Sequence, residues 1–264
     1  MPAHKRQHYV PRCHLKPFST TVDGKTINLF NIARNKAIYS AAIKTQCASS
    51  YFYGKDLKLE RALQDIEGKY SLVVKNLVEC GTLGCSELDF LRGFSLLQYF
   101  RTDIALHRTQ LAETEMVNVI FDNEEQRSVY GAMPQKELIK NPIEHFKAVP
   151  PCISDLKTVV LHNKTGGEFV TSDDPAIQLN RLYVQKFGRS AGCAGFVNAG
   201  LMLLLPLSPD YVLCSYDGDV YTCPDRIKNV VEITKVSDVM ALNRLQFIKA
   251  HENIYFRKSL ARLV

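Results

Sequence analysis

Long apolar runs are missing from this sequence. The longest one, Leu201–Leu205, is far shorter than the roughly 20 residues that a membrane-spanning helix needs. No apolar stretch follows the basic N-terminus, so we expect no secretion signal, a cytoplasmic location and no membrane partner. Repeats and low-complexity linkers are also lacking. With 46% apolar and 23% charged residues, the composition excludes a disordered, fibrous or highly charged chain.

Paired cysteines and the common catalytic motifs are lacking as well. The chain has eight cysteines but no C-x-x-C pair. Because no secretion signal accompanies them, we expect reduced thiols rather than disulfides. There is no H-E-x-x-H, no Walker loop and no G-x-S-x-G. A zinc protease, a P-loop nucleotidase and a serine hydrolase of the usual kinds therefore have no sequence support.

Acidic residues are missing from the first 22 positions, which include Lys5, Arg6 and Arg12 and carry a charge of +4. Residues 244–264 carry another +4, so the net charge of +6 leaves −2 for the 221 residues between them. If the two ends meet in the fold, they form a basic patch that attracts a polyanion such as nucleic acid. The alternative is two solvated basic ends.

The spacing of apolar residues predicts an α+β fold. A hairpin is expected over Thr26–Tyr39, a helix over Leu57–Cys80, a second helix from Ser86 to about Phe121, and a third over about 124–139. After Pro150 the period changes to that of strands and one helix, with a loop over 180–198. Strands are expected at 156–162, 168–172 (its hairpin partner), 199–205, 211–216, 220–223, 230–234 and 254–256, and a helix at 237–251. We therefore expect a single domain over 1–264, in which an antiparallel sheet of the N-terminal hairpin and C-terminal strands carries a helical insertion at about 57–140.

An arginine interrupts the apolar stripe of the second predicted helix. The stripe consists of Phe90, Phe94, Leu97, Arg101, Ile104, Arg108 and Leu111. Burying a guanidinium costs several kcal/mol unless a carboxylate, carbonyl groups or a bound anion compensate it. We therefore expect Arg101, and with it Arg108, to face an acid or to line an anion site. An internal structural pair with Asp or Glu is the alternative.

Candidate carboxylates are present elsewhere in the chain. Glu67 lies beside the apolar stripe of the first helix, and Asp173 and Asp174 end a predicted strand just before Pro175. A residue before proline is held in extended geometry, which suits a catalytic carboxylate or a divalent-metal site at these two aspartates. The same sequence suits a turn cap equally well.

The opening segment resembles the signature of a large bacterial family known only as a domain of unknown function. The motif Gln-His-Tyr-Val-Pro stands at Gln7–Pro11 and is followed by Leu15 and Phe18, whereas Cys13-His14 replaces the usual aromatic pair. Later landmarks that look like the family are Ile66-Glu67, Gln98–Thr102, Phe169–Pro175 with its Thr-Ser-Asp-x-Pro motif, Leu205–Pro209, Leu242-Asn243 and Tyr255-Phe256. The resemblance implies that distant polar residues form one constellation, namely His8, Glu67, Arg101, Asp173 and Asn243.

Such a constellation suits phosphodiester chemistry. His8 would act as general base or acid, Arg101 would stabilise the developing charge, and a carboxylate would orient the imidazole or hold a divalent metal. The basic residues expected to contact a nucleic-acid backbone are Lys5, Arg6, Arg12 and Arg108.

The sequence therefore predicts a nuclease that acts on RNA or single-stranded nucleic acid. The family resemblance adds the expectation of a toxin or phage-defence role, with a protein partner from such a system. The alternative is a non-catalytic sensor or interaction module, in which the same residues bind an anionic or nucleotide ligand.

Overall fold

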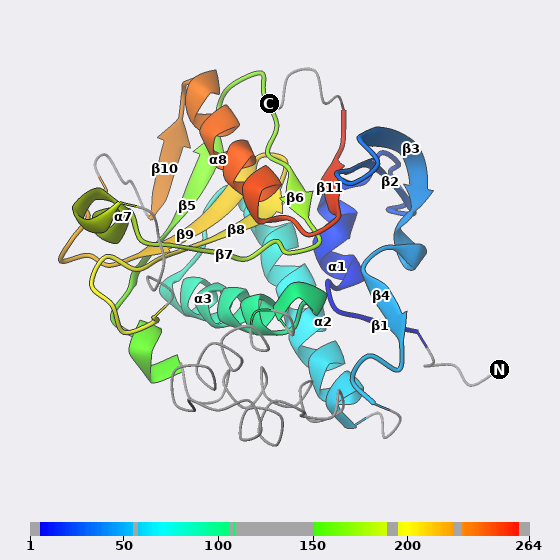
Figure 1. Ribbon diagram of the computed structural model, residues 1–264, viewed down its shortest axis with the longest axis horizontal. Helices are drawn as coiled ribbons and strands as arrows, with labels where there is room; N and C mark the ends of the chain where they lie inside the picture. The colour runs from blue at the N-terminus through cyan, green and yellow to red at the C-terminus, as the bar shows by residue number, and fades with distance from the viewer. Residues whose placement is uncertain are drawn as a thin grey trace, which may run out of the picture.

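The computed structural model describes residues 6–54, 58–105, 108, 150–188, 195–223 and 229–258. Within these ranges the expected α+β class is confirmed, because antiparallel-rich sheets combine with long helices that lie between the N-terminal and C-terminal strands (Figure 1). No helix in these ranges is long and apolar enough to cross a membrane. The assignment of the whole chain to one domain stays a prediction.

A five-stranded sheet is the largest element of the fold. Its strands, in spatial order, are β10 (Val230–Ile233), β5 (Lys157–Asn163), β9 (Tyr211–Tyr216), β8 (Met202–Ser208) and β7 (Ile177–Leu179). Only β10 runs parallel to its neighbour, and all other pairs are antiparallel. Among the described residues, β7 therefore forms one edge of this sheet.

Among the described residues, three long helices pack around the sheet. α2 spans Lys58–Cys80 and α3 spans Cys85–Phe100, and the two are fastened by the stacked rings of Tyr70 and Phe94, whose centroids lie 3.9 Å apart. α8 spans Val236–Lys249. The predicted first helix and the C-terminal helix are thus found within one or two residues of their expected ends.

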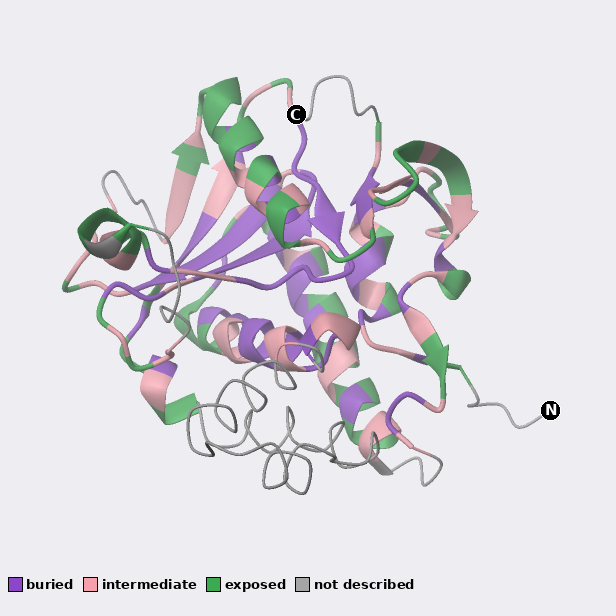
Figure 2. Cartoon of the chain, in the orientation of Figure 1, coloured by how far each residue is buried: buried purple, intermediate pink, exposed green. Residues whose placement is uncertain are grey.

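The helices cover opposite faces of the sheet. α2 and α3 pack against Leu205 and Leu213, whereas α8 packs through Val239 against Leu204 and Val212. Figure 2 shows the strands buried between these layers. Because both faces are covered, β8 and β9 are nearly continuous apolar runs instead of alternating ones.

The N-terminal hairpin and the C-terminal strand share a second sheet. Its order is β3 (Lys36–Ala42), β2 (Thr26–Asn31), β11 (Asn253–Phe256) and β6 (Thr171–Ser172), and a separate small sheet pairs β1 (Arg6–His8) with β4 (Ala48–Ser50). The remaining helical segments of the described ranges are short: α1 (Arg12–Leu15), α7 (Arg181–Phe187) and 3-10 turns at Lys16–Phe18, Ile43–Thr45 and Pro150–Ile153. The expected hairpin over Thr26–Tyr39 is therefore confirmed.

The second long helix ends at Phe100 and does not continue to Phe121 as predicted. Arg101 is the C-cap of this helix, residues 101–102 form a bend, and the Thr102 hydroxyl accepts a hydrogen bond from the Ala105 N–H at 3.3 Å. Threonine in this place acts as the N-cap of a new helical turn, so one apolar stripe does not run through the segment. The expected helix over 124–139 lies outside the described residues, as does most of the insertion beyond Ala105.

The predicted hairpin of strands 156–162 and 168–172 is wrong. β5 pairs with β9 and β10, whereas β6 pairs with β11 in the other sheet. Asn163 turns the chain between them, because its side chain accepts from the Thr165 N–H and donates to the Gly167 carbonyl. The expected loop after residue 180 begins instead with α7, and no strand forms at 220–223.

Candidate functional site

Arg101 is buried and paired, as an arginine on an apolar helix face must be. Its side chain is 1% exposed, and its guanidinium donates to the Glu67 carboxylate at 2.8 Å, to the His8 carbonyl at 3.0 Å and to the Tyr53 hydroxyl at 3.0 Å. Burial alone would lower the pKa of Arg101, but Tyr53 and Glu67 raise it, so the guanidinium stays charged. This is the internal structural pair that the sequence analysis named as the alternative to an anion site.

His8 joins this group through its backbone. Burial lowers the pKa of the His8 imidazole to about 4, and the nearby charges of Arg12, Arg6 and Arg101 lower it further, against a hydrogen bond to the backbone of Lys44 that raises it. The ring is neutral at pH 7, but its Nε2 atom is buried and hydrogen-bonds to no described residue. General-base chemistry at Nε2 would first require this atom to become exposed.

Asp173 is a cap for the turn that enters β11. Its two carboxylate oxygens accept from the backbone N–H groups of His251, Glu252 and Asn253 at 2.7–2.9 Å. Burial raises the pKa of Asp173, although these three donors act to lower it. The turn-cap reading of this aspartate is the one that the structure supports.

The side chain of Asn243 also hydrogen-bonds to backbone groups. It is 1% exposed, accepts from the Val170 N–H at 3.0 Å and donates to the Glu168 carbonyl at 2.9 Å. Among the described residues, no hydrogen bond or ion pair links Asp173 or Asn243 to the Arg101–Glu67 pair. The structure thus brings His8, Glu67 and Arg101 together and leaves the other two in separate contacts.

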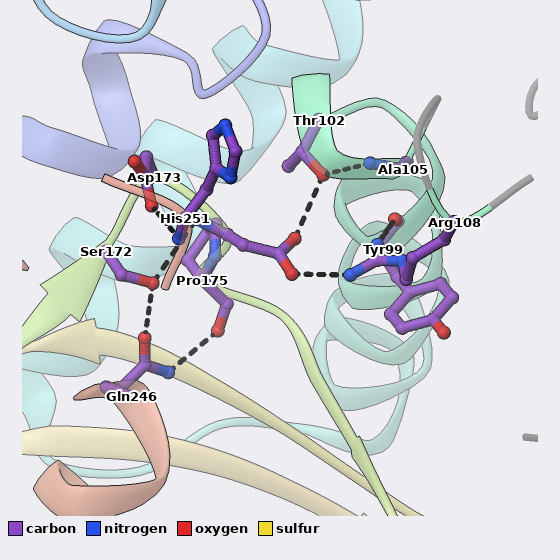
Figure 3. Close-up of polar contacts among 10 residues, drawn as sticks. Tyr99, Thr102, Ala105, Arg108, Ser172, Asp173, Pro175, Gln246 and His251 are labelled. Carbon is purple, nitrogen blue, oxygen red and sulfur yellow. Dashed lines mark hydrogen bonds and ion pairs between the residues drawn. The ribbon is translucent and has the colours of Figure 1, made fainter. Parts of the chain in front are cut away.

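Asp174 follows Asp173 in the chain but has different partners. Figure 3 shows Thr102 and Arg108, which bind Asp174, apart from His251, whose backbone N–H donates to Asp173. Its carboxylate is 2% exposed, accepts from the Thr102 hydroxyl at 2.9 Å and forms an ion pair with Arg108 at 2.5 Å. Burial raises its pKa, and the charges of Arg108 and Lys249 and the hydrogen bonds of Arg108 and Thr102 oppose that shift. Arg108 also donates to the Tyr99 carbonyl at 2.6 Å, and its guanidinium carbon lies 4.1 Å from the centre of the Tyr99 ring.

A cavity of about 290 Å³ opens beside this ion pair. Its walls come from the end of α3 and the following turn, from the segment that contains β7, and from the end of α8; they include Tyr99, Ile104, Arg108, Asp174, Gln178, Ile248 and Lys249. Arg108 and Lys249 outweigh the single carboxylate by one positive charge. The Nε2 donor of Gln178 is buried and has no partner among the described residues. The charged side chains that line the cavity therefore have a net charge of +1.

The expected divalent-metal site at Asp173 and Asp174 does not fit this geometry. The oxygens of Asp173 are taken by backbone N–H groups, and those of Asp174 by a hydroxyl and a guanidinium. Nowhere in the described ranges do three or more His, Cys, Asp or Glu side chains gather as a metal-binding group. A cation would have to compete with Arg108 for its carboxylate.

Of the residues expected to contact nucleic acid, Arg6 and Arg12 lie near His8, whereas Arg108 lies at the cavity. Arg6 is exposed and donates to the Thr45 carbonyl, whereas Arg108 lines the cavity. At the other end of the chain, Arg257 and Lys258 are paired with Glu168, which neutralises part of the C-terminal charge. Arg12 is exposed on α1, and Lys5 lies outside the described residues.

His14 is buried and hydrogen-bonds to two other segments of the chain, a role that the sequence analysis did not predict. Its Nδ1 lies 2.9 Å from the Tyr70 hydroxyl and its Nε2 lies 2.8 Å from the Thr171 hydroxyl, so one ring joins α1, α2 and β6. Burial lowers its pKa to about 3, with a further contribution from the charge of Arg101. The only sequence signal was the replacement of the family's aromatic pair at this position.

This burial predicts an acid-sensitive contribution to stability. The pKa of His14 is lower in the folded protein than the ordinary 6.5 of an unfolded chain. As the pH falls from about 6.5 toward 3, His14 is therefore protonated in the unfolded chain and not in the folded protein, which lowers the free energy of unfolding. Between pH 7.5 and 5 we expect wild type to lose about 2 kcal/mol more than His14→Gln. Urea unfolding at both pH values measures this difference.

The subtraction isolates His14, because His8 and the buried aspartates contribute to both proteins alike. Equal losses in wild type and variant would contradict a neutral, buried His14.

The fold and cavity define an α+β protein with a positively charged pocket at a sheet edge. The chain belongs to the family described as protein of unknown function (DUF4238), whose sequence profile matches residues 6–259. The resemblance seen in the sequence is thereby confirmed. No curated protein and no solved structure matches the chain.

Proposed function

We propose that this protein is a ligand-binding module whose cavity takes an anionic group. The observation that carries the proposal is the excess of positive charge in one cavity of ligand size, where Arg108 and Lys249 lie near a carboxylate that Arg108 already neutralises. Pockets that bind small ligands have volumes from about 300 Å³ upward, with a few placed polar groups among apolar walls. A guanidinium stacked on Tyr99 is held in one orientation, which favours a fixed contact with carboxylate or phosphate.

Thermal unfolding in acetate, phosphate and adenosine monophosphate tests the proposal, with chloride at matched ionic strength as reference. A ligand at about 100 times its Kd raises the free energy of unfolding by about 2.7 kcal/mol. We expect at least one of these anions to stabilise wild type, and Arg108→Gln and Lys249→Gln to remove that stabilisation.

Arg181→Gln is the matched control, because Arg181 is exposed on α7 and is not part of the cavity wall. Lys249 is exposed, so its variant keeps the fold even if Arg108→Gln leaves Asp174 unpaired and less stable. Stabilisation of all four proteins to the same extent would contradict the proposal.

A nuclease stays the second proposal. Its support is the cluster of basic side chains whose charges act on the neutral imidazole of His8, including Arg6 and Arg12. Incubation of wild type and His8→Ala with labelled RNA and single-stranded DNA decides it. Cleavage that His8→Ala loses supports a nuclease, whereas no cleavage under any metal condition removes it. A toxin or phage-defence role, a cytoplasmic location and a protein partner stay predictions of the sequence.

A further inference from the structure

The outer edge of β7 presents backbone groups to the cavity. The Asp217 N–H donates to the Leu201 carbonyl at 2.9 Å, which fixes the alternation of hydrogen bonds along the β8–β9 pair. Leu203 and Leu205 then bond to β9, and Met202 and Leu204 bond to β7.

In the β7–β8 register, Met202 opposes Leu179 and Leu204 opposes Ile177. Gln178 stands between these two bonded positions. Because alternate residues of a strand direct their backbone groups to opposite sides, both the N–H and the C=O of Gln178 point away from β8.

The cavity follows this edge. Ala176, Ile177, Gln178, Leu179 and Asn180 all line it, although successive side chains of a strand point to opposite faces. Its other walls come from the α3 side and from α8, which cover opposite faces of the sheet. A hollow bordered by both layers and by consecutive strand residues lies along the sheet edge.

Charge is unevenly distributed along the edge. Arg108 is bonded to Asp174, and the charge of Lys249 acts on the same carboxylate, so both cations lie near the residue that leads into β7. The opposite end of the cavity is lined by Leu179 and Asn180. An added strand that runs antiparallel to β7 places its C-terminus at the cationic end.

We infer that the anionic group is the C-terminal carboxylate of an extended peptide, which adds to β7 as an antiparallel strand. This rests on the proposed function, because the carboxylate uses the same Arg108 and Lys249. Backbone hydrogen bonds to Gln178 supply affinity, as in other cases of strand addition. The side chains of the peptide alternate between the wall with Ile104 and the wall with Ile248, which supply apolar contacts on either side.

The test begins with a bead-displayed library of pentapeptides that carry free C-terminal carboxylates. An enriched peptide is then synthesised and its Kd measured by fluorescence anisotropy against wild type and two variants. Gln178→Ala keeps the backbone N–H and is expected to bind within about threefold of wild type. Gln178→Pro loses the side chain as Gln178→Ala does and removes the N–H as well, at a position where an edge strand tolerates proline. It is expected to bind at least about tenfold more weakly, the effect of one hydrogen bond.

Two modified peptides test the same contacts on wild-type protein and do not depend on how the proline variant folds. Amidation of the C-terminus, and N-methylation of the residue that faces Gln178, should each weaken binding by about tenfold or more. Binding that neither modification changes would overturn the inference.

The two proposals fail separately. If acetate or phosphate stabilises wild type through Arg108 and no peptide is enriched, the cavity binds small anions and strand addition is wrong. If neither anions nor peptides bind, both proposals are wrong.

Discussion

Replacing Arg101 with alanine is expected to lower the free energy of unfolding by about 3–5 kcal/mol. The guanidinium is the shared partner of Glu67, Tyr53 and the His8 carbonyl, and its removal leaves these groups without their donor in a largely buried place. Glu67→Gln should cost less, because Arg101 keeps Tyr53 and His8 as partners. Urea unfolding of both variants and of the double variant measures the coupling between the two side chains.

Lys75→Ala is the control for this series. Lys75 and Glu79 form an ion pair on the same helix as Glu67, but both are more than half exposed, so the change should stay within about 0.5 kcal/mol. A loss below about 1 kcal/mol for Arg101→Ala would mean that the guanidinium is not the buried junction described above. If Arg101→Ala abolished an activity and left the free energy of unfolding unchanged, Arg101 would instead be a catalytic residue.

Asp173→Ala is expected to lower the free energy of unfolding by about 2–4 kcal/mol. The variant leaves three backbone N–H groups at the start of β11 without their acceptor, and a buried unsatisfied group costs about 1–3 kcal/mol. Asp173→Asn retains one acceptor oxygen and should lose less. Thermal or urea unfolding distinguishes these losses.

Asp219→Ala serves as the matched control, because Asp219 is exposed and surface changes of this kind stay within about 0.5 kcal/mol. Asp173→Asn with wild-type stability but no activity would contradict the capping role and favour the catalytic one.

Elements with strong local periodicity could be predicted from the sequence. α2 follows its apolar spacing, and the hairpin of β2 and β3 follows its two strand-like segments and the turn between them. The predicted second helix is too long, because the N-cap role of Thr102 is a local feature that an apolar stripe does not reveal. The hairpin of β5 and β6 failed because strand pairing depends on partners from distant segments.

The candidate site likewise contains residues that the sequence predicted and residues that it did not. The cost of burying a guanidinium predicted a partner for Arg101, and Glu67 was among the candidates named for it. Gln178 and Lys249 gave no signal, because a glutamine in a short strand and a lysine at a helix end are ordinary surface residues until an edge and a cavity place them together.

The sequence by itself determined the α+β class, the family, the first long helix and the need for a charge partner at Arg101, since each follows from local spacing, motif or solvation. Only the tertiary structure decided that Asp173 is a cap, that Asp174 belongs to Arg108, and that β7 ends its sheet beside a positively charged cavity. Each of these contacts joins segments that are far apart in the chain, so local spacing and motifs do not predict it.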